Sequence, residues 1–214
     1  MLKVIAFDLD GTIAETFPII LSSFKKTVYQ YTNKNISSQE IFDTFGLNEI
    51  GMLKTLIPNF SPKMVDTFYH NYKINHKKLV QPFLGIKDLI KFLKSKKILT
   101  IIITGKGKVS TNISLSALKL KQFFPLILTG SDKGPNKLHR LKQVIKKYHL
   151  TNNEIAYISD DIRDIKVCKK IGIICFSAGW ANSSDLTQQK KYNNKAFSSI
   201  KQLKGYLSKI LCKK

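Results

Sequence analysis

Short apolar segments that each end in small or polar residues constrain the fold of this chain most strongly. Five of them occur, at residues 3–7, 98–103, 126–128, 155–158 and 171–176. Runs of this length that are apolar throughout are typical of strands buried on both faces of a parallel sheet. Apolar residues at helical spacing lie between them, as in the set Leu138, Leu141, Val144, Ile145 and Tyr148. The alternation predicts an α/β fold with helices on both faces of the sheet.

The connection between the first two predicted strands is too long to be a simple crossover. It spans about 90 residues, whereas one crossover helix with its loops needs far fewer. Helical signals fill this stretch, including the capping-box pattern of Ser37 and Glu40. We therefore expect a Rossmann-like parallel sheet core with an inserted α-helical cap subdomain. The expected core comprises residues 1–14 and 83–214, and the expected cap comprises residues 15–82.

The acidic residues are few and concentrated. The chain has 14 Asp and Glu residues, and five lie in two short clusters: Asp8 and Asp10, then Asp160, Asp161 and Asp164. Each cluster follows a predicted strand directly, and ligands of parallel sheets bind at the carboxyl ends of the strands. The clusters favour a site for a hard cation such as Mg²⁺ bound together with phosphate, although Asp also caps helices and forms turns. In such a site one carboxylate can attack phosphorus while another serves as acid and base.

The net charge of +22 raises the question of a nucleic-acid partner. Only Arg140 and Arg163 among 36 basic residues are arginines, the side chain that most often makes bidentate phosphate and base contacts. Because the lysines are spread over nearly every predicted helix, we expect no specific nucleic acid, only weak adhesion to polyanions. We expect no membrane partner, because no apolar run approaches the ~20 residues of a span. Three cysteines without a recognisable export signal predict a cytoplasmic protein with reduced thiols.

The motifs together resemble those of the haloacid dehalogenase-like phosphatase superfamily. The five residues from Asp8 to Thr12 are similar to its first motif. Thr104, at the end of the second predicted strand, matches the second motif, Lys137 matches the lysine of the third, and residues 159–164 match the acidic fourth motif. The helical insertion is similar to the cap of the phosphoglycolate phosphatase-like branch, so the resemblance covers the whole chain.

The resemblance implies a role for each motif. Asp8 would be the nucleophile and a Mg²⁺ ligand. Asp10 would protonate the leaving group, then activate water, and would offer its backbone carbonyl to the metal. Asp160 would be the third metal ligand. Thr104 would hydrogen-bond the phosphoryl oxygens, and Lys137 would neutralise the charge of nucleophile and phosphate.

Some assignments stay open at the level of sequence. Asp164 and Asp161 are both candidates for bracing the metal site, and either could simply stabilise the start of a helix. Lys133 and Lys106 compete with Lys137 as the active-site cation, because lysine is abundant throughout the chain. We favour Lys137, since Lys133 is expected in a solvated loop and Lys106, between two glycines, in a mobile turn.

We therefore predict an enzyme, a Mg²⁺-dependent phosphatase that acts on a small phosphorylated metabolite through an aspartyl-phosphate. Phosphoglycolate is the first substrate that the branch resemblance suggests. A phosphomutase on a sugar phosphate would use the same core, and a noncatalytic basic module that binds nucleic acid is the alternative from another class. The sequence leaves the substrate, the pathway and the oligomeric state open.

Overall fold

A six-stranded parallel sheet forms the centre of the molecule. The computed structural model describes residues 1–79 and 81–212. The strand order is β3-β2-β1-β4-β5-β6, and each neighbouring pair is parallel. The strands are β1 (Val4–Phe7), β2 (Leu99–Ile103), β3 (Ile127–Leu128), β4 (Ile155–Ser159), β5 (Ile174–Ala178) and β6 (Ala196–Phe197). The predicted α/β fold with a Rossmann-like parallel sheet is confirmed.

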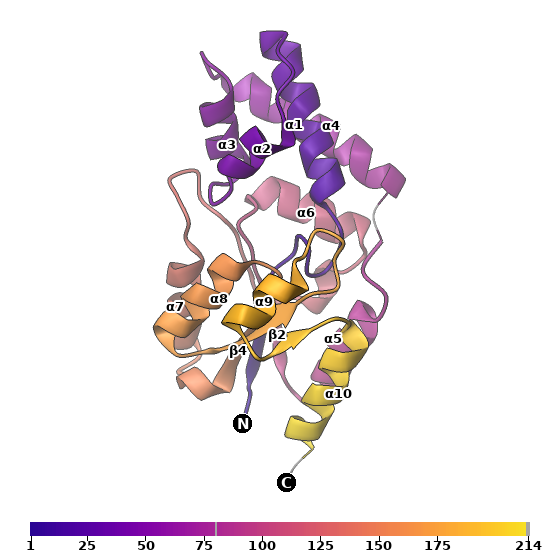
Figure 1. The fold of residues 1–214 in the computed structure, drawn as a ribbon, viewed down its shortest axis with the longest axis vertical. Helices are drawn as coiled ribbons and strands as arrows, with labels where there is room; N and C mark the ends of the chain where they lie inside the picture. The colour runs from indigo at the N-terminus through magenta and orange to yellow at the C-terminus, as the bar shows by residue number, and fades with distance from the viewer. Residues whose placement is uncertain (80, 213–214) are drawn as a thin grey trace.

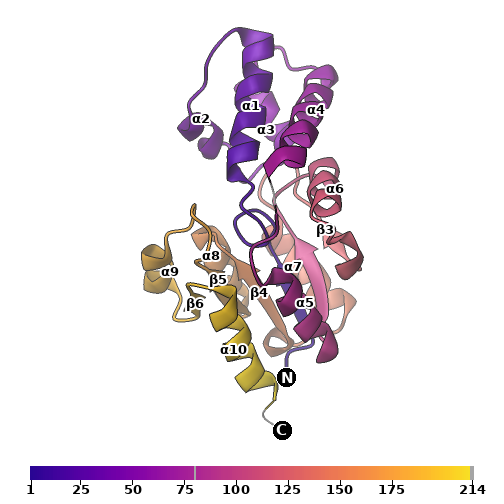
Figure 2. The same ribbon diagram turned by 90° about the vertical axis from the view of Figure 1, so that its right-hand side faces the viewer.

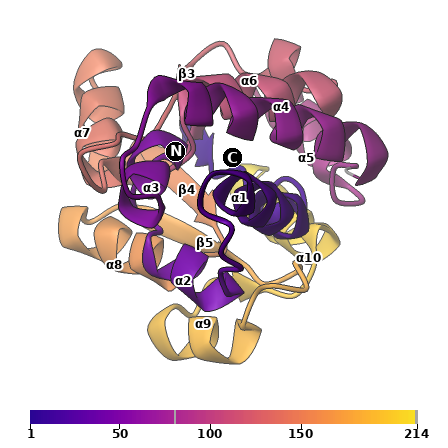
Figure 3. The ribbon, with the colours of Figure 1, turned by 90° about the horizontal axis from the view of Figure 1, so that it is seen from above.

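Helices cover both faces of this sheet. Successive residues of β1 point to opposite sides. Ile5 and Phe7 belong to one apolar cluster with α5 (Ile86–Ser95) and α10 (Ile200–Leu211), and Val4 and Ala6 to another with α7 (Lys137–Lys147) and α8 (Ile162–Ile171). Figure 3 shows these two pairs of helices on opposite sides of the strands. The core also contains α6 (Lys108–Ala117) and α9 (Leu186–Tyr192). Two 3₁₀ turns lie at Lys121–Phe123 and Asn152–Glu154.

The long connection after β1 consists of helices. They are α1 (Phe17–Thr32), α2 (Ser38–Asp43), α3 (Glu49–Leu56) and α4 (Pro62–Leu79). Figures 1 and 2 show them together at one end of the molecule, opposite both termini. The chain enters and leaves this region at adjacent points, because Phe83 N donates to Ile13 O at 2.9 Å. We call the four helices with their loops, residues 17–79, the cap and the sheet with its flanking helices the core.

Two details of the sheet differ from the sequence interpretation. The predicted strand at 171–176 begins too early, because α8 extends to Ile171 and ends at Gly172, whose φ of 70° is the left-handed conformation that favours glycine. The edge strand β6 was not predicted, because two residues are too short to show a periodic pattern. None of the helices in the described part of the chain combines the length and the apolar character needed to cross a bilayer.

Candidate active site

The carboxyl ends of the central strands bring the predicted site residues together. Asp8 follows β1, Thr104 follows β2 and Asp160 follows β4, while Lys137 is the first residue of α7. A cavity of about 500 Å³, which we call the strand-end cavity, lies at this edge of the sheet. Its lining includes all the predicted site residues, namely Asp8, Asp10, Thr104, Lys137, Asp160, Asp161 and Asp164.

A sharp turn after β1 places the first acidic cluster against the second. Gly11 has a φ of 69°, and a Cβ atom there would lie 2.2 Å from Asp160 Oδ2. Thr12 Oγ1 donates to Asp160 Oδ1 at 3.2 Å and accepts from Asp160 N at 3.1 Å. Glycine is therefore required both for the backbone conformation and for the close approach.

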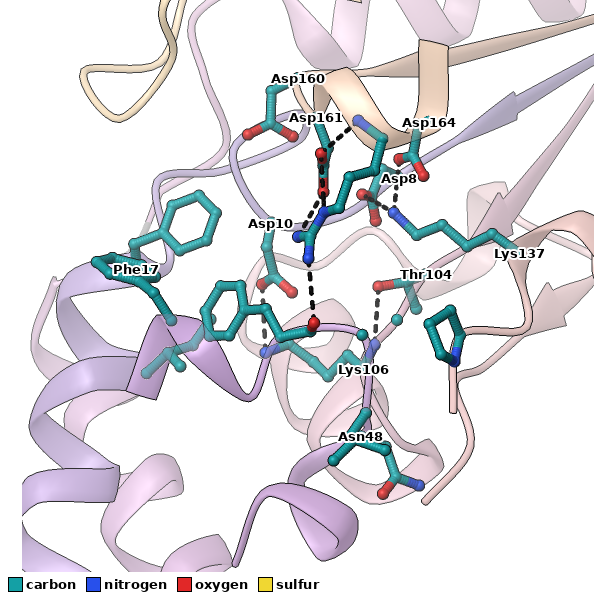
Figure 4. Close-up of a pocket in the computed structure, with 18 of the residues that line it drawn as sticks. Asp8, Asp10, Phe17, Asn48, Thr104, Lys106, Lys137, Asp160, Asp161 and Asp164 are labelled. Atoms are coloured by element: carbon teal, nitrogen blue, oxygen red, sulfur yellow. Dashed lines mark hydrogen bonds and ion pairs between the residues drawn. The ribbon is translucent and has the colours of Figure 1, made fainter. Parts of the chain in front are cut away.

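Lys137 lies between two buried carboxylates. Its Nζ atom donates to Asp8 Oδ2 and to Asp164 Oδ2, each at 2.6 Å (Figure 4). Burial raises the pKa of Asp8 to about 6, with Lys137 opposing this rise and Asp164 adding to it. Burial lowers the pKa of Lys137, but the charges of Asp164 and Asp8 outweigh this effect and place it above the usual range. The lysine therefore stays charged beside the predicted nucleophile.

Asp10 is held by a separate set of contacts. The Thr16 hydroxyl donates to its carboxylate, and Lys106 Nζ lies 3.2 Å from Asp10 Oδ1. Lys106 is buried, with its ammonium 4.7 Å from the centre of the Tyr72 ring in the cap. The segment that we expected to be a mobile turn is instead held by a hydrogen bond of 2.8 Å from Gly130 N to Lys106 O. Sequence reasoning named Lys106 as a candidate but set it aside in favour of Lys137, because its burial depends on distant residues of the cap.

The three acids after β4 have different surroundings. Asp164 is buried and also accepts a hydrogen bond from the Ser159 hydroxyl. Asp161 caps α8 by accepting from Arg163 N at 2.7 Å, and it forms an ion pair with the Arg163 guanidinium at 2.6 Å. Asp160 has no cationic partner within 4 Å among the described residues. Burial and the nearby carboxylates raise the pKa of Asp160 well above its usual value.

The donor set fits a divalent cation. Carboxylate and backbone carbonyl oxygens are the hard ligands that Mg²⁺ prefers, and Mg²⁺ usually takes only one or two carboxylates. The predicted set comprises the side chains of Asp8 and Asp160 and the carbonyl of Asp10. No group of three His, Cys, Asp or Glu side chains with metal-binding geometry occurs in residues 1–79 and 81–212, and the predicted set does not require one. A bound cation would favour the charged form of Asp160, which has no cationic partner among the described residues.

The cap supplies the opposite wall of the strand-end cavity. Figure 4 shows Phe17, from α1, across the cavity from Lys137. The rings of Phe17, Phe42 and Phe45 contact one another, with centroids 5.2 to 6.4 Å apart. The apolar residues of this wall are Phe17, Ile20, Phe24, Phe42, Phe45, Leu47, Met52 and Phe68. The sequence did not identify them as site residues, because apolar residues at helical spacing usually indicate a helix face that packs in the core.

Fold and site together define an α/β enzyme with a phosphate-compatible acidic centre at the ends of its strands. The model of the haloacid dehalogenase-like hydrolase family matches residues 5–178, and the chain belongs to this family. This confirms the family predicted from the four motifs, and with it the prediction of an enzyme.

Curated relatives are similar to the chain in sequence, and solved structures share its fold. The chain is 26% identical over 183 residues to the pyrophosphatase PpaX of Halalkalibacterium halodurans, with 84% of this chain and 85% of that protein covered. The match to PpaX of Bacillus pumilus is 25% over 185 residues, covering 84% of each. A haloacid dehalogenase-like protein from Streptococcus pneumoniae has a similar fold, with a TM-score of 0.74, 20% identity and 96% and 98% coverage. So does CbbY from Rhodobacter sphaeroides in complex with phosphate, with a TM-score of 0.72, 16% identity and 86% and 90% coverage.

Proposed function

We propose that the protein is a Mg²⁺-dependent phosphatase that hydrolyses small phosphate monoesters through an aspartyl-phosphate on Asp8. The observation that carries this proposal is the separate anchoring of two carboxylates at the end of β1. Asp8 is held by Lys137, and Asp10 by Thr16 and Lys106. Transfer in two steps needs one carboxylate that attacks phosphorus and another that moves protons. The names of the relatives, which are pyrophosphatases, support phosphate chemistry of this kind.

The proposed reaction divides the chemistry between these two groups. In the first step an oxygen of Asp8 bonds to phosphorus while the ester bond breaks, and Asp10 gives its proton to the departing alkoxide. In the second step Asp10 takes a proton from water, whose oxygen attacks the aspartyl-phosphate and releases phosphate and free Asp8. Lys137 stays charged beside Asp8 and stabilises negative charge on the phosphoryl group. Thr104, at the end of β2, would donate a hydrogen bond to a phosphoryl oxygen.

Metal binding completes the proposal. Asp8, Asp160 and the carbonyl of Asp10 would hold Mg²⁺, which when bound balances the charge of phosphate and carboxylates. We assign Asp164 the positioning of Lys137, because its carboxylate is 2.6 Å from Nζ. Asp161 is assigned to capping α8 and orienting Arg163, and so acts on the metal site only indirectly.

The proposal covers phosphate monoesters as a class, not phosphoglycolate in particular. A cytoplasmic location and the absence of a specific nucleic-acid partner also stay predictions. The three cysteines Cys168, Cys175 and Cys212 are free thiols in the structure, in keeping with the first of these.

The test is hydrolysis of para-nitrophenyl phosphate by the purified full chain. We expect turnover with Mg²⁺, almost none in excess chelator, and poor substitution by Ca²⁺, which favours looser and higher coordination. Mass spectrometry after rapid acid quenching should find one phosphate on the peptide that contains Asp8. Full activity in chelator would contradict the metal dependence, and a phosphate carried by another residue would contradict the assignment of the nucleophile.

A further inference from the structure

The two walls of the strand-end cavity differ in what they can offer a leaving group. The cap contributes one charged side chain to the described lining, Glu49 of α3. Its carboxylate is already engaged, because Oε2 accepts from Gly107 N at 2.7 Å and Oε1 from Ser110 Oγ at 2.6 Å. Asn48 caps α3, and its side-chain oxygen accepts a hydrogen bond from Ile50 N. The rest of the cap wall is apolar apart from its backbone.

The cations that line the cavity are also engaged. Among the described lining residues only three are basic, and each lies within 3.2 Å of a carboxylate oxygen. The pairs are Lys137 with Asp8 and Asp164, Lys106 with Asp10, and Arg163 with Asp161. The carboxylates outnumber them, and comprise Asp8, Asp10, Glu49, Asp160, Asp161, Asp164 and Asp185. A Mg²⁺ ion and Lys137 can balance one phosphate, which leaves no free cation for a second anionic group.

Aromatic surface is what the cap does offer. Phe42 is 38% exposed, although it is a large apolar side chain that lines the cavity and contacts Phe17 and Phe45. Exposed apolar surface of this kind is stabilised when another apolar group covers it, and rings in contact gain further from edge or offset stacking. A carboxylate or phosphate in the same place would lose its hydration without gaining a partner.

We infer that the preferred substrate is a phosphate monoester whose leaving group is uncharged and carries an apolar ring, bound against Phe17, Phe42 and Phe45. This inference rests on the proposed phosphatase activity. It distinguishes the chain from enzymes for substrates with two separate anionic groups, such as phosphoglycolate or pyrophosphate. It also disfavours a sugar phosphate, whose hydroxyls would find few hydrogen-bond partners on the cap wall.

Steady-state kinetics on matched substrates test the inference. The four probes are 2-phenylethyl phosphate, methyl phosphate, phosphoglycolate and inorganic pyrophosphate, at saturating Mg²⁺. We expect kcat/KM for 2-phenylethyl phosphate to exceed each of the other three by at least about tenfold, because one or two buried apolar groups are worth that much in specificity. Alkyl esters are used, since an aryl ester would react faster through its better leaving group alone.

Three cap variants test which residue carries the preference. Phe42→Ala should reduce the preference for 2-phenylethyl phosphate over methyl phosphate by about tenfold. Tyr29→Ala is the matched control, because Tyr29 is an exposed aromatic residue of α1 outside the strand-end cavity, and it should leave the preference unchanged. Phe42→Lys should raise kcat/KM for phosphoglycolate, since it adds the cation that the cap wall lacks.

The outcomes separate this inference from the proposed function. Hydrolysis of all monoesters with phosphoglycolate or pyrophosphate preferred would overturn the inference and leave the phosphatase proposal intact. An unchanged preference in Phe42→Ala, with this variant and Tyr29→Ala both folded by circular dichroism, would overturn it as well. Failure to hydrolyse any of the four probes or para-nitrophenyl phosphate would overturn both.

Discussion

The two walls of the strand-end cavity differ in the chemistry of their side chains, which are mostly charged or polar in the core and mostly apolar in the cap. Apart from Glu49 of the cap, the charged groups of the described lining belong to the core wall. They are fixed near strand ends and helix starts, as Asp8 is after β1 and Lys137 at the first residue of α7. The cap wall carries rings and aliphatic side chains from α1 to α4. Reacting atoms need fixed, compensated charges, whereas a leaving group needs only a surface of matching shape and polarity. Changes to the core should therefore alter turnover on every substrate, and changes to the cap should alter which substrate is preferred.

The largest expected effect comes from Asp8→Asn in the core wall. Asparagine keeps the shape of the side chain but is a poor nucleophile and loses the charge that pairs with Lys137. We expect nearly all turnover to disappear on every substrate, with the fold retained by circular dichroism. Loss of a nucleophile in other hydrolases costs several orders of magnitude, so residual activity above about one tenth would contradict the assignment.

The next largest effect is expected from the lysine beside Asp8. Lys137→Ala should lower kcat/KM at least about tenfold, because it removes the partly buried cation that pairs with Asp8, the proposed nucleophile. The matched control is Lys133→Ala, which alters an exposed lysine in the loop that precedes α7 and should cost less than about threefold. Steady-state kinetics at equal Mg²⁺ compare the two. A normal Lys137→Ala enzyme beside an impaired Lys133→Ala enzyme would show that Lys133, not Lys137, is the active-site lysine.

Lys106→Ala tests the role of Asp10 separately from that of Asp8. Lys106 contacts Asp10 and not Asp8, so its loss should slow the steps that depend on proton transfer. We expect the defect to be larger on methyl phosphate than on para-nitrophenyl phosphate, whose leaving group needs little protonation. An equal defect on both substrates would show that Lys106 serves binding or folding and not the positioning of Asp10.

The strands of the core and the acids at their ends could be predicted from the sequence for a simple physical reason. Strands buried on both faces leave continuous apolar runs, and the acids that end them stand out in a chain so rich in lysine. The sequence alone therefore predicts that Asp8, Thr104 and Asp160 lie at one edge of the sheet. The edge strand β6 and the true start of β5 could not be predicted, because short segments and helix ends depend on tertiary contacts.

The cap side of the site was much harder to predict from the sequence. All three of Phe24, Phe42 and Phe68 line the cavity and look alike in the sequence, but Phe24 and Phe68 are buried whereas Phe42 is exposed. Which of them faces a ligand depends on how four helices pack, and periodicity alone does not report this. The burial of Lys106 by Tyr72 depends on the same packing.

A smaller effect is expected from the joint between cap and core. Glu49 in α3 accepts two hydrogen bonds at the start of α6, so it holds the cap wall over the site. Glu49→Gln should lower kcat/KM about three- to tenfold, because a charged acceptor is replaced by a neutral one and the closed arrangement weakens. Lys54→Ala is the control, since its ion pair with Asp132 spans the same boundary but is largely exposed and should matter little. Equal effects of the two variants would contradict a special role for Glu49.

The smallest effect should appear only in acid, at His76 of α4. Its Nε2 atom lies 2.9 Å from Ser114 Oγ of α6 and 3.0 Å from Tyr72 OH, and its Nδ1 atom is buried without a partner among the described residues. Burial lowers the pKa of His76 from 6.5 to about 4; the charge of Lys106 adds to this and that of Asp10 opposes it.

Because the folded pKa of His76 lies below the unfolded one, the unfolded state binds more protons between these two values. The free energy of unfolding should thus be unaffected by this group above about pH 6.5 and fall as the pH drops toward 4. His76→Gln, which keeps an amide near the position of Nε2, should remove this dependence and gain about 1 kcal/mol on the wild type between pH 7 and 5.5. Urea unfolding at both pH values measures the difference. Parallel losses in the two proteins would show that His76 is not the group that weakens the joint between α4 and α6 in acid.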